Sequence, residues 1–369
     1  MAGGQCPPYT SVMVVDVHCH VGLTARRVDP AIPRFSFERD GAAGSPGYDS
    51  YISPRFFAIP SWFFITRWLG LNRKLPRGDE LDRQIEAINE MHFANCPSVD
   101  RLALLAFDEC YDDAGRAQGM APRGHYGSDL YVSNSSVRAM CERRPEKFIF
   151  AASIHPYRSG ACEMLAEVAA AGAKLVKWLP IHQNINIEDR RTVDFLRQAA
   201  RLGIPMLIHY GGELSLSRQH MEFESPLPLL GVLRGLRDEG SMPIVIVAHV
   251  ATPSFIWQSA ENCWTFIDAM LGEFGDAPLY ADISALAAFG RTPWLRRLAP
   301  RRDLHRKLLF GTDFPIPVMV GSYWRQLSRA ERAAIRNLPS WIEQDYQLKR
   351  QLGYEDCVFT QAAPLLKLV

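Results

Sequence analysis

This sequence has no excess of charge of either sign: 41 Lys and Arg residues stand against 40 Asp and Glu residues, and the formal net charge is +1. A general nucleic-acid-binding protein needs a basic excess to neutralise phosphates, so that class is excluded. The eight cysteines form no CxxC pair, which argues against a thiolate zinc site or a redox pair. Scattered thiols are typical of a reducing compartment, and the first residues lack the pattern of a signal peptide. We therefore expect a cytoplasmic protein.

Long hydrophobic runs are also missing. The most apolar tract, residues 56–71, is too short to span a bilayer and is interrupted by Pro60 and Arg67. We expect no membrane partner and interpret the tract as a buried or half-buried loop and helix. The alternative is an apolar lid over a site, formed by Phe56, Phe57, Trp62, Phe63, Phe64 and Trp68. The sequence also lacks a GxSxG elbow and a P-loop, so it indicates no covalent nucleophile and no phosphate cradle.

Short apolar runs alternate with helical stretches along the chain. The runs are rich in Val, Ile, Leu and Phe, as is typical of parallel strands buried on both faces, and cover residues 12–17, 102–107, 148–154, 173–176, 204–208, 244–247, 279–283 and 308–310. We expect helices at 79–95, 135–144, 160–171, 188–202, 226–239, 253–274 and 292–306. The alternation predicts an α/β fold, a (β/α)8 TIM barrel, in one domain over residues 1–369. An open doubly wound sheet is the alternative, but its Gly-rich phosphate turn is missing.

Three regions lie outside the repeat. Residues 22–78 form a long insertion after the first strand, and residues 108–130 form a polar, Gly-rich loop after the second. In a barrel both would lie over the C-terminal ends of the strands, where substrates are selected. Residues 323–369 form a C-terminal extension, in which we expect helices at 323–353 and 359–368 that pack against the outside of the barrel.

The first strand ends in a His-x-His motif. Residues i and i+2 of a strand face the same side, so His18 and His20 are expected to point into one space and Cys19 away from it. Asp16 is expected to face the same interior one layer deeper, as a supporting group rather than a ligand. Two imidazoles side by side favour a divalent metal ion.

Later strands end in residues of the same chemical kind. The fourth, fifth, sixth and eighth runs end near Lys177, His209, His249 and Asp313. A barrel brings all these ends to one mouth. Neutral imidazoles and a carboxylate suit Zn2+ or a similar divalent ion, which lowers the pKa of a bound water to about 7. Asp313 fits as the carboxylate that accepts and returns the proton.

The ordered set of HxH, Lys, His, His and Asp on strands one, four, five, six and eight resembles the amidohydrolase superfamily. The segments VDVHCHVG, LIHYGGE, VIVAHV and LLFGTDFP are most similar to its amidohydrolase-related branch, and the resemblance covers roughly residues 12–365. That branch includes metal-dependent hydrolases and enzymes of the aminocarboxymuconate-semialdehyde decarboxylase type. The resemblance therefore implies a metal-dependent enzyme on a barrel.

Carried over to this chain, the resemblance makes His18, His20, His209 and Asp313 metal ligands. In decarboxylase-like members one metal is implied, and His249 is then a catalytic residue beside it. In members with two metals a carboxylated lysine bridges the ions; Lys177 would be that lysine and His249 a ligand. An unmodified Lys177 paired with a substrate carboxylate or a neighbouring aspartate remains the alternative.

The resulting prediction is a hydrolase that uses metal-activated water, with one or two Zn2+ ions, on an amide, ester or lactone bond of a small organic substrate. Asp313 and His249 are the predicted catalytic residues, and His155, Trp178 and His182 are predicted to line the substrate pocket. One alternative is a metal-dependent non-oxidative decarboxylase of a small carboxylic acid. Another is a catalytically silent barrel that only binds a ligand. The expected partner is a small molecule, and barrels of this type often pair as homodimers.

Overall fold

The structure, a computed structural model, describes residues 13–58, 63, 66–67, 69–71, 78–122 and 125–369. Eight strands form one sheet in which every paired neighbour is parallel. In sheet order they are β1 (Val15–His20), β4 (Arg101–Leu105), β6 (Phe148–Ala152), β7 (Leu175–Trp178), β8 (Met206–His209), β9 (Val245–Ala248), β10 (Leu279–Asp282) and β11 (Leu308–Leu309). Each overlaps a predicted apolar run, with ends that differ by up to three residues.

The last strand returns to the first and closes the sheet. The Val17 amide donates to the Phe310 carbonyl at 3.1 Å, and the His20 amide donates to the Phe314 carbonyl at 2.8 Å. The predicted (β/α)8 barrel is therefore confirmed, and the alternative of an open sheet is wrong.

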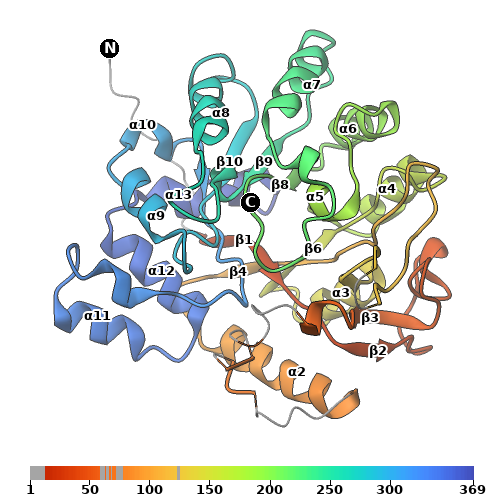
Figure 1. Cartoon of the computed structure of the whole chain (residues 1–369), viewed down its shortest axis with the longest axis horizontal. Coiled ribbons are helices and arrows are strands. Elements are labelled where there is room, and N and C mark those ends of the chain that lie inside the picture. The colour runs from red at the N-terminus through yellow and green to blue at the C-terminus, as the bar shows by residue number, and fades with distance from the viewer. Residues whose placement is uncertain (1–12, 59–62, 64–65, 68, 72–77, 123–124) are drawn as a thin grey trace.

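Helices follow most strands and surround the barrel (Figure 1). They are α2 (Asp79–Ala94), α3 (Asn134–Arg143), α4 (Ala161–Ala170), α5 (Pro180–Gln183), α6 (Arg190–Leu202), α7 (Leu227–Asp238), α8 (Glu261–Leu271), α9 (Thr292–Leu298) and α10 (Arg302–His305). Two predicted helices are shorter than expected. The helix predicted at 253–274 begins at Glu261, and the one predicted at 292–306 is divided, because Pro300 cannot donate a backbone hydrogen bond.

Two hydrophobic clusters hold the barrel together. The inner cluster fills the interior with side chains that alternate along the strands, such as Val15 and Val17 of β1 and Ala103 and Leu105 of β4. The outer cluster lies between the other face of the strands and the surrounding helices. A closed barrel needs both layers, because each strand has two buried faces.

The two predicted loop regions over the strand ends are joined by a small antiparallel sheet. Strands β2 (Ala25–Arg27) and β3 (Tyr48–Ile52) come from the insertion, and β5 (Leu130–Val132) ends the loop after β4. Short 3-10 turns lie at Ser36–Glu38, Phe56–Ala58, Met221–Phe223, His249–Ala251 and Val320–Tyr323. The small sheet fixes the insertion against the second loop over the mouth of the barrel.

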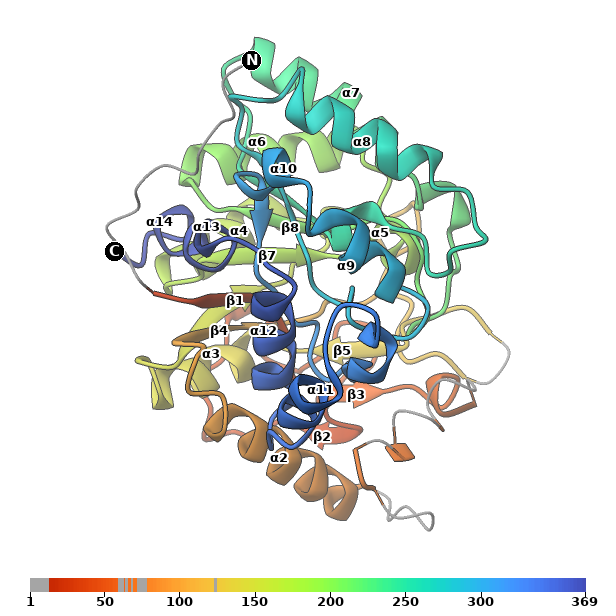
Figure 2. The ribbon, with the colours of Figure 1, turned by 90° about the vertical axis from the view of Figure 1, so that its left-hand side faces the viewer.

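The C-terminal extension forms α11 (Arg329–Arg336), α12 (Trp341–Gln351), α13 (Asp356–Thr360) and α14 (Ala362–Leu365). The predicted packing against the outside holds for α12, whose Tyr346 ring contacts the outward-facing Phe310. It is wrong for α14, because Ala362, Ala363 and Leu366 belong to the inner cluster. Figure 2 shows α14 next to the beginning of β1, so this helix closes the barrel at the end opposite the site. Among the described residues, no helix has the length and hydrophobicity needed to cross a membrane.

Candidate metal centre

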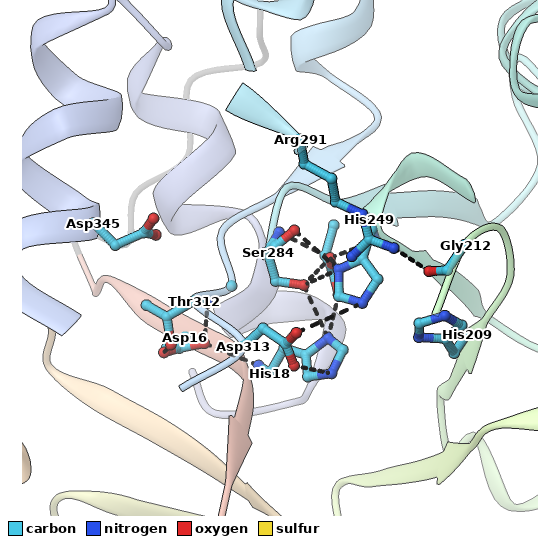
Figure 3. A network of polar contacts seen from close by, with 12 residues as sticks. Asp16, His18, His209, Gly212, His249, Ser284, Arg291, Thr312, Asp313 and Asp345 are labelled. Atoms are coloured by element: carbon cyan, nitrogen blue, oxygen red, sulfur yellow. Dashed lines mark hydrogen bonds and ion pairs between the residues drawn. The ribbon is translucent and has the colours of Figure 1, made fainter. Parts of the chain in front are cut away.

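A bulge in β1 decides which of its side chains reach the interior. The pairing with β4 gains one residue between Asp16 and Cys19, so the consecutive residues Val17 and His18 both face inward. Asp16 faces the opposite side, and the prediction that it shares the interior with His18 is wrong. From there it accepts hydrogen bonds from the Thr312 amide at 3.0 Å and the Thr312 hydroxyl at 2.6 Å (Figure 3). Asp16 thus ties β1 to the loop after β11.

Side chains from the two ends of the chain meet at the mouth of the barrel. Oδ1 of Asp313 lies 3.2 Å from Nε2 of His18 and 3.2 Å from Nε2 of His20, and these two nitrogens are 3.2 Å apart. Nε2 of His249 lies 3.9 Å from Oδ2 of Asp313. Ligand atoms of His18, His249 and Asp313 all lie within 4.8 Å of one another, close enough to share one cation.

His209 completes the predicted set. Its ring lies 4.9 Å from the ring of His249, centroid to centroid, and both side chains line the same cavity (Figure 3). Nε2 of His209 is buried and has no hydrogen-bond partner among the described residues. A buried polar atom without a partner is costly, and a bound cation would satisfy it. The donor set therefore fits a divalent metal ion.

Hydrogen bonds at Nδ1, the ring nitrogen that faces away from the cavity, fix the tautomer of two histidines. Nδ1 of His249 donates to the carbonyl oxygen of Ser284 at 2.9 Å, and Nδ1 of His18 donates to Oδ2 of Asp282 at 2.9 Å. Since each Nδ1 carries the proton, each Nε2 presents a lone pair to Asp313 and the cavity. Outer hydrogen bonds of this kind orient imidazoles that bind metals.

The electrostatics of the centre also suit a cation. Burial lowers the pKa of His18, His209 and His249, so the three imidazoles are neutral at neutral pH. Burial by itself would raise the pKa of Asp313, but the nearby His18, His20 and Lys177 outweigh it and hold that pKa below its usual range. Neutral nitrogens and one carboxylate are the donors that Zn2+ and related ions accept.

Lys177 lies beside this cluster on β7. Its Nζ is 3.0 Å from Nε2 of His18, and burial lowers the pKa of the amine to about 8. A lysine with a pKa near neutral is partly uncharged, and so able to form a carbamate; as the ammonium it can pair with a carboxylate. The structure places Lys177 next to the candidate metal ligands.

The backbone at two of the site residues adopts the left-handed region. The φ angles are 62° at Asp313 and 53° at His249, although neither residue is glycine. The Asp313 amide donates to the His18 carbonyl at 2.8 Å, which holds the Asp313 backbone against β1. Such conformations cost free energy and persist where the surroundings enforce them, often at functional sites.

The three predicted substrate-pocket residues lie elsewhere. Trp178 packs on Phe195 in the outer cluster and donates its indole N–H to the Ile154 carbonyl at 2.7 Å. Nε2 of His155 donates to the Gln183 carbonyl at 2.8 Å, and Nε2 of His182 accepts from the Asp129 amide at 3.1 Å. All three side chains are fully buried and none is among the described lining residues. The prediction that they line the pocket is corrected accordingly.

The cavity at the centre measures about 150 Å³ and has two chemically distinct parts. The residues that we call the polar floor are His18, His20, Lys177, His209, Glu213, His249 and Asp313. Those that we call the apolar wall are Ile52, Phe56, Leu69, Ile85, Ile88, Phe107, Leu130, Leu179, Leu216, Pro315 and Ile316. Gly22, Asn89 and Ser215 complete the described lining.

Of the predicted aromatic lid, Phe56 lines the cavity, Phe63 is 60% exposed, and Trp62, Phe64 and Trp68 lie outside the described residues.

Sequence reasoning missed Glu213 of the floor and Arg291 beside it, two buried residues with ionisable side chains. Oε2 of Glu213 lies 3.5 Å from Nε2 of His209, and burial raises the pKa of the Glu213 carboxyl group. Arg291 donates to the Gly212 carbonyl, and its Nε has no partner among the described residues (Figure 3). Glu213 follows His209 by four residues in the segment IHYGGE, and that spacing is the signal that could have indicated it.

No protein-family model and no curated protein matches the sequence. Among solved structures, the chain is similar to an uncharacterised TIM-barrel protein from Bordetella bronchiseptica, with a TM-score of 0.50. The two share 16% sequence identity, over 92% of this chain and 99% of that one. A likeness at this identity establishes the barrel fold.

Two enzymes are similar at lower TM-scores. One is a probable 2-pyrone-4,6-dicarboxylic acid hydrolase from Acinetobacter baumannii, with a TM-score of 0.46 and 14% identity over 96% of this chain and 99% of that one. The other is 5-carboxyvanillate decarboxylase from Sphingomonas paucimobilis, with a TM-score of 0.48 and 12% identity over 97% of this chain and 99% of that one.

Proposed function

We propose that this protein is a metal-dependent hydrolase that cleaves an amide, ester or lactone bond in a small organic substrate. The observation that carries the proposal is the convergence of His18, His20, His249 and Asp313 within a few ångströms at the mouth of the barrel. His209, whose buried Nε2 makes no hydrogen bond with the described residues, is the fifth candidate donor. Zn2+ is our first choice of ion because imidazole nitrogens dominate this donor set.

The residues of the centre divide the work. His18, His20, His209 and Asp313 would hold the ion, which when bound would supply an activated water and polarise the scissile carbonyl group. Asp313 is ionised and can accept a proton from the attacking water at a carboxylate oxygen, then return that proton to the leaving group. Nε2 of His249 lies 3.9 Å from Oδ2 of Asp313 and presents its lone pair to the same cavity.

Residues behind the floor hold the histidines of the centre in place. Asp282 fixes the ring of His18 through Nδ1, and its other carboxylate oxygen accepts from the His249 amide at 2.9 Å. One buried carboxylate therefore holds the ring of His18 and the backbone of His249. Such orientation keeps the lone pairs directed at one point, which pre-organises the site for a cation.

Non-oxidative decarboxylation is the second candidate, and Lys177 is the observation that favours it. Lys177 is the only Lys or Arg among the described lining residues, and it lies on the floor. As an ammonium group it would bind the carboxylate that leaves as carbon dioxide. As a carbamate it would instead bridge two ions, which favours hydrolysis.

Metal analysis combined with a product assay tests the proposal. The purified protein is expected to contain at least one divalent ion per chain, and a panel of esters, lactones and amides is expected to be hydrolysed. Chelation should remove the activity, and Zn2+ or Mn2+ should restore it. Release of carbon dioxide from a panel of small carboxylic acids, without hydrolysis, would establish the second candidate. A chain that retains no metal after reconstitution would overturn both.

A further inference from the structure

The apolar wall differs from the polar floor in both origin and chemistry. The floor comes from the ends of barrel strands, whereas the wall comes largely from the insertion, α2 and the loops over the mouth. On α2, Ile85, Ile88 and Asn89 all line the cavity. Their spacing of three and four residues places them on one face of the helix. Ile52 of β3 and Leu130 of β5 line the cavity from the small antiparallel sheet.

Three described arginines of the insertion are engaged in ion pairs. Arg26 pairs with Glu86 at 3.0 Å, Arg34 pairs with Asp49, and Arg55 pairs with Asp129 at 2.6 Å. None of these arginines is among the described lining residues. A substrate anion placed against the described wall would lose its hydration without gaining a counter-charge, which is strongly unfavourable.

One neutral polar side chain interrupts the wall. Asn89 is 9% exposed and lines the cavity. Its side-chain amide makes no hydrogen bond with any described residue. An amide offers both a donor and an acceptor, so it can pair with one hydroxyl or carbonyl group of a ligand. It provides no charge to balance a carboxylate or phosphate.

We infer that the substrate carries an uncharged alkyl or aryl substituent that lies against the apolar wall, with Ile88 as a specificity-determining residue. The inference deepens the proposed function and rests on it for the position of the reacting group on the polar floor. Apolar contact on the wall then selects the substrate, while the floor performs the chemistry.

A pair of isosteric probes separates the two parts of the cavity. Benzohydroxamic acid carries a head group that binds metal ions, and a 4-isopropyl or a 4-carboxylate substituent adds three non-hydrogen atoms of similar shape. Binding of both probes to the Zn2+-loaded protein is measured by isothermal titration calorimetry. The isopropyl probe is expected to bind about tenfold more tightly than the carboxylate probe.

Helix α2 offers a matched pair of variants. Ile88→Lys places an ammonium group at the wall, so it is expected to weaken the isopropyl probe, strengthen the carboxylate probe and lower their affinity ratio about tenfold. Met91→Lys, three residues further on, adds the same charge at a side chain that is 40% exposed and is not among the described lining residues. It should leave the ratio unchanged. Thermal melts of both variants establish that each one folds.

The outcomes are distinct. Equal affinities in the native protein, or tighter binding of the carboxylate probe, would overturn the inference while leaving the metal centre intact. If Ile88→Lys and Met91→Lys changed the ratio of the two probe affinities by the same factor, the role of Ile88 would be overturned. A protein without metal that binds neither probe would contradict the proposed function and the inference together, and metal analysis of the same sample identifies that case.

Discussion

The polar floor and the apolar wall of one cavity are built by different rules. Floor residues such as His18, His209 and Asp313 lie in or just after the ends of barrel strands, which any barrel must bring together. Wall residues such as Ile52, Ile88 and Leu130 lie on elements added over the mouth. The floor is fixed by the closed sheet, and the wall by local contacts of the insertion. Under the proposed function, this difference assigns the chemistry to the floor and the selection of the substrate to the wall.

The largest effect is expected from the floor. Asp313→Asn keeps the size of the side chain and tolerates the left-handed backbone, but it removes the charge and the proton acceptor. Turnover should fall by about a thousandfold or more. Steady-state kinetics measures the loss, and circular dichroism verifies the fold. A variant that keeps more than a tenth of the native turnover would contradict the role of Asp313.

A smaller effect is expected one layer behind the floor. Asp282→Asn weakens the hydrogen bond to Nδ1 of His18, so the affinity for the metal ion should fall about 10–100-fold. Competition with a fluorescent zinc chelator measures this affinity. The control is Asp276→Asn, since Asp276 is exposed and precedes the same strand. Equal zinc affinities in the two variants would show that Asp282 does not support the centre.

The buried histidines predict a pH dependence of stability in the metal-free protein. Burial lowers the pKa of His249, so the unfolded chain takes up a proton below about pH 6.5 that the folded chain does not. Stability is therefore lost as the pH falls below about 6.5, by up to about 1.4 kcal/mol per pH unit for this histidine. Asp16 has the opposite effect on stability, because burial raises the pKa of its carboxyl group to about 7. The stability that its protonated form contributes is lost as the pH rises through that value.

Comparing the pH dependence of unfolding in two variants isolates the contribution of His249. Urea unfolding of the metal-free protein between pH 5 and 6.5 should show a shallower pH dependence for His249→Gln than for the native chain. His125→Gln, at an exposed position, should reproduce the native slope. Parallel profiles for the native chain and His249→Gln would contradict a neutral, buried His249.

The smallest effect is expected from the support of the insertion. Arg55 donates to Asp129 at 2.6 Å, and to the carbonyls of His125 and Gly127 at 2.7 Å each, linking the insertion to the loop after β4. Arg55→Ala should loosen the wall and raise KM by roughly threefold to tenfold with little change in kcat. Arg26→Ala removes a more exposed pair and should leave KM unchanged. A fall in kcat without a change in KM would mean that the two parts of the cavity are not separable.

The sequence predicted the floor better than the wall for a physical reason. A parallel strand buried on both faces is a continuous apolar run, so its end is visible in the sequence, and Lys177, His209 and His249 lie at such ends. The strands β2, β3 and β5 are short, and β2 and β3 are also partly polar, for example YDSYI in β3, so the sequence gives little sign of them. Their pairing depends on contacts between distant segments that no local pattern reveals.

Errors in the site came from the direction of side chains. Lys177 and Trp178 are consecutive on β7, so only one of them can face the interior, and alternation by itself argues against Trp178 once Lys177 is placed there. The bulge that turns His18 inward and Asp16 outward depends on the pairing of β1 with β4. Such a register shift follows from the closed barrel and has no signature in the sequence.

One measurement tests the central claim most directly. Crystals grown with Zn2+ and measured at the zinc absorption edge would show an anomalous difference peak wherever the ion binds. The account predicts a peak at the polar floor, about 2.0–2.2 Å from donor atoms of His18, His20 and Asp313. A fully loaded crystal with no peak among these side chains would contradict it.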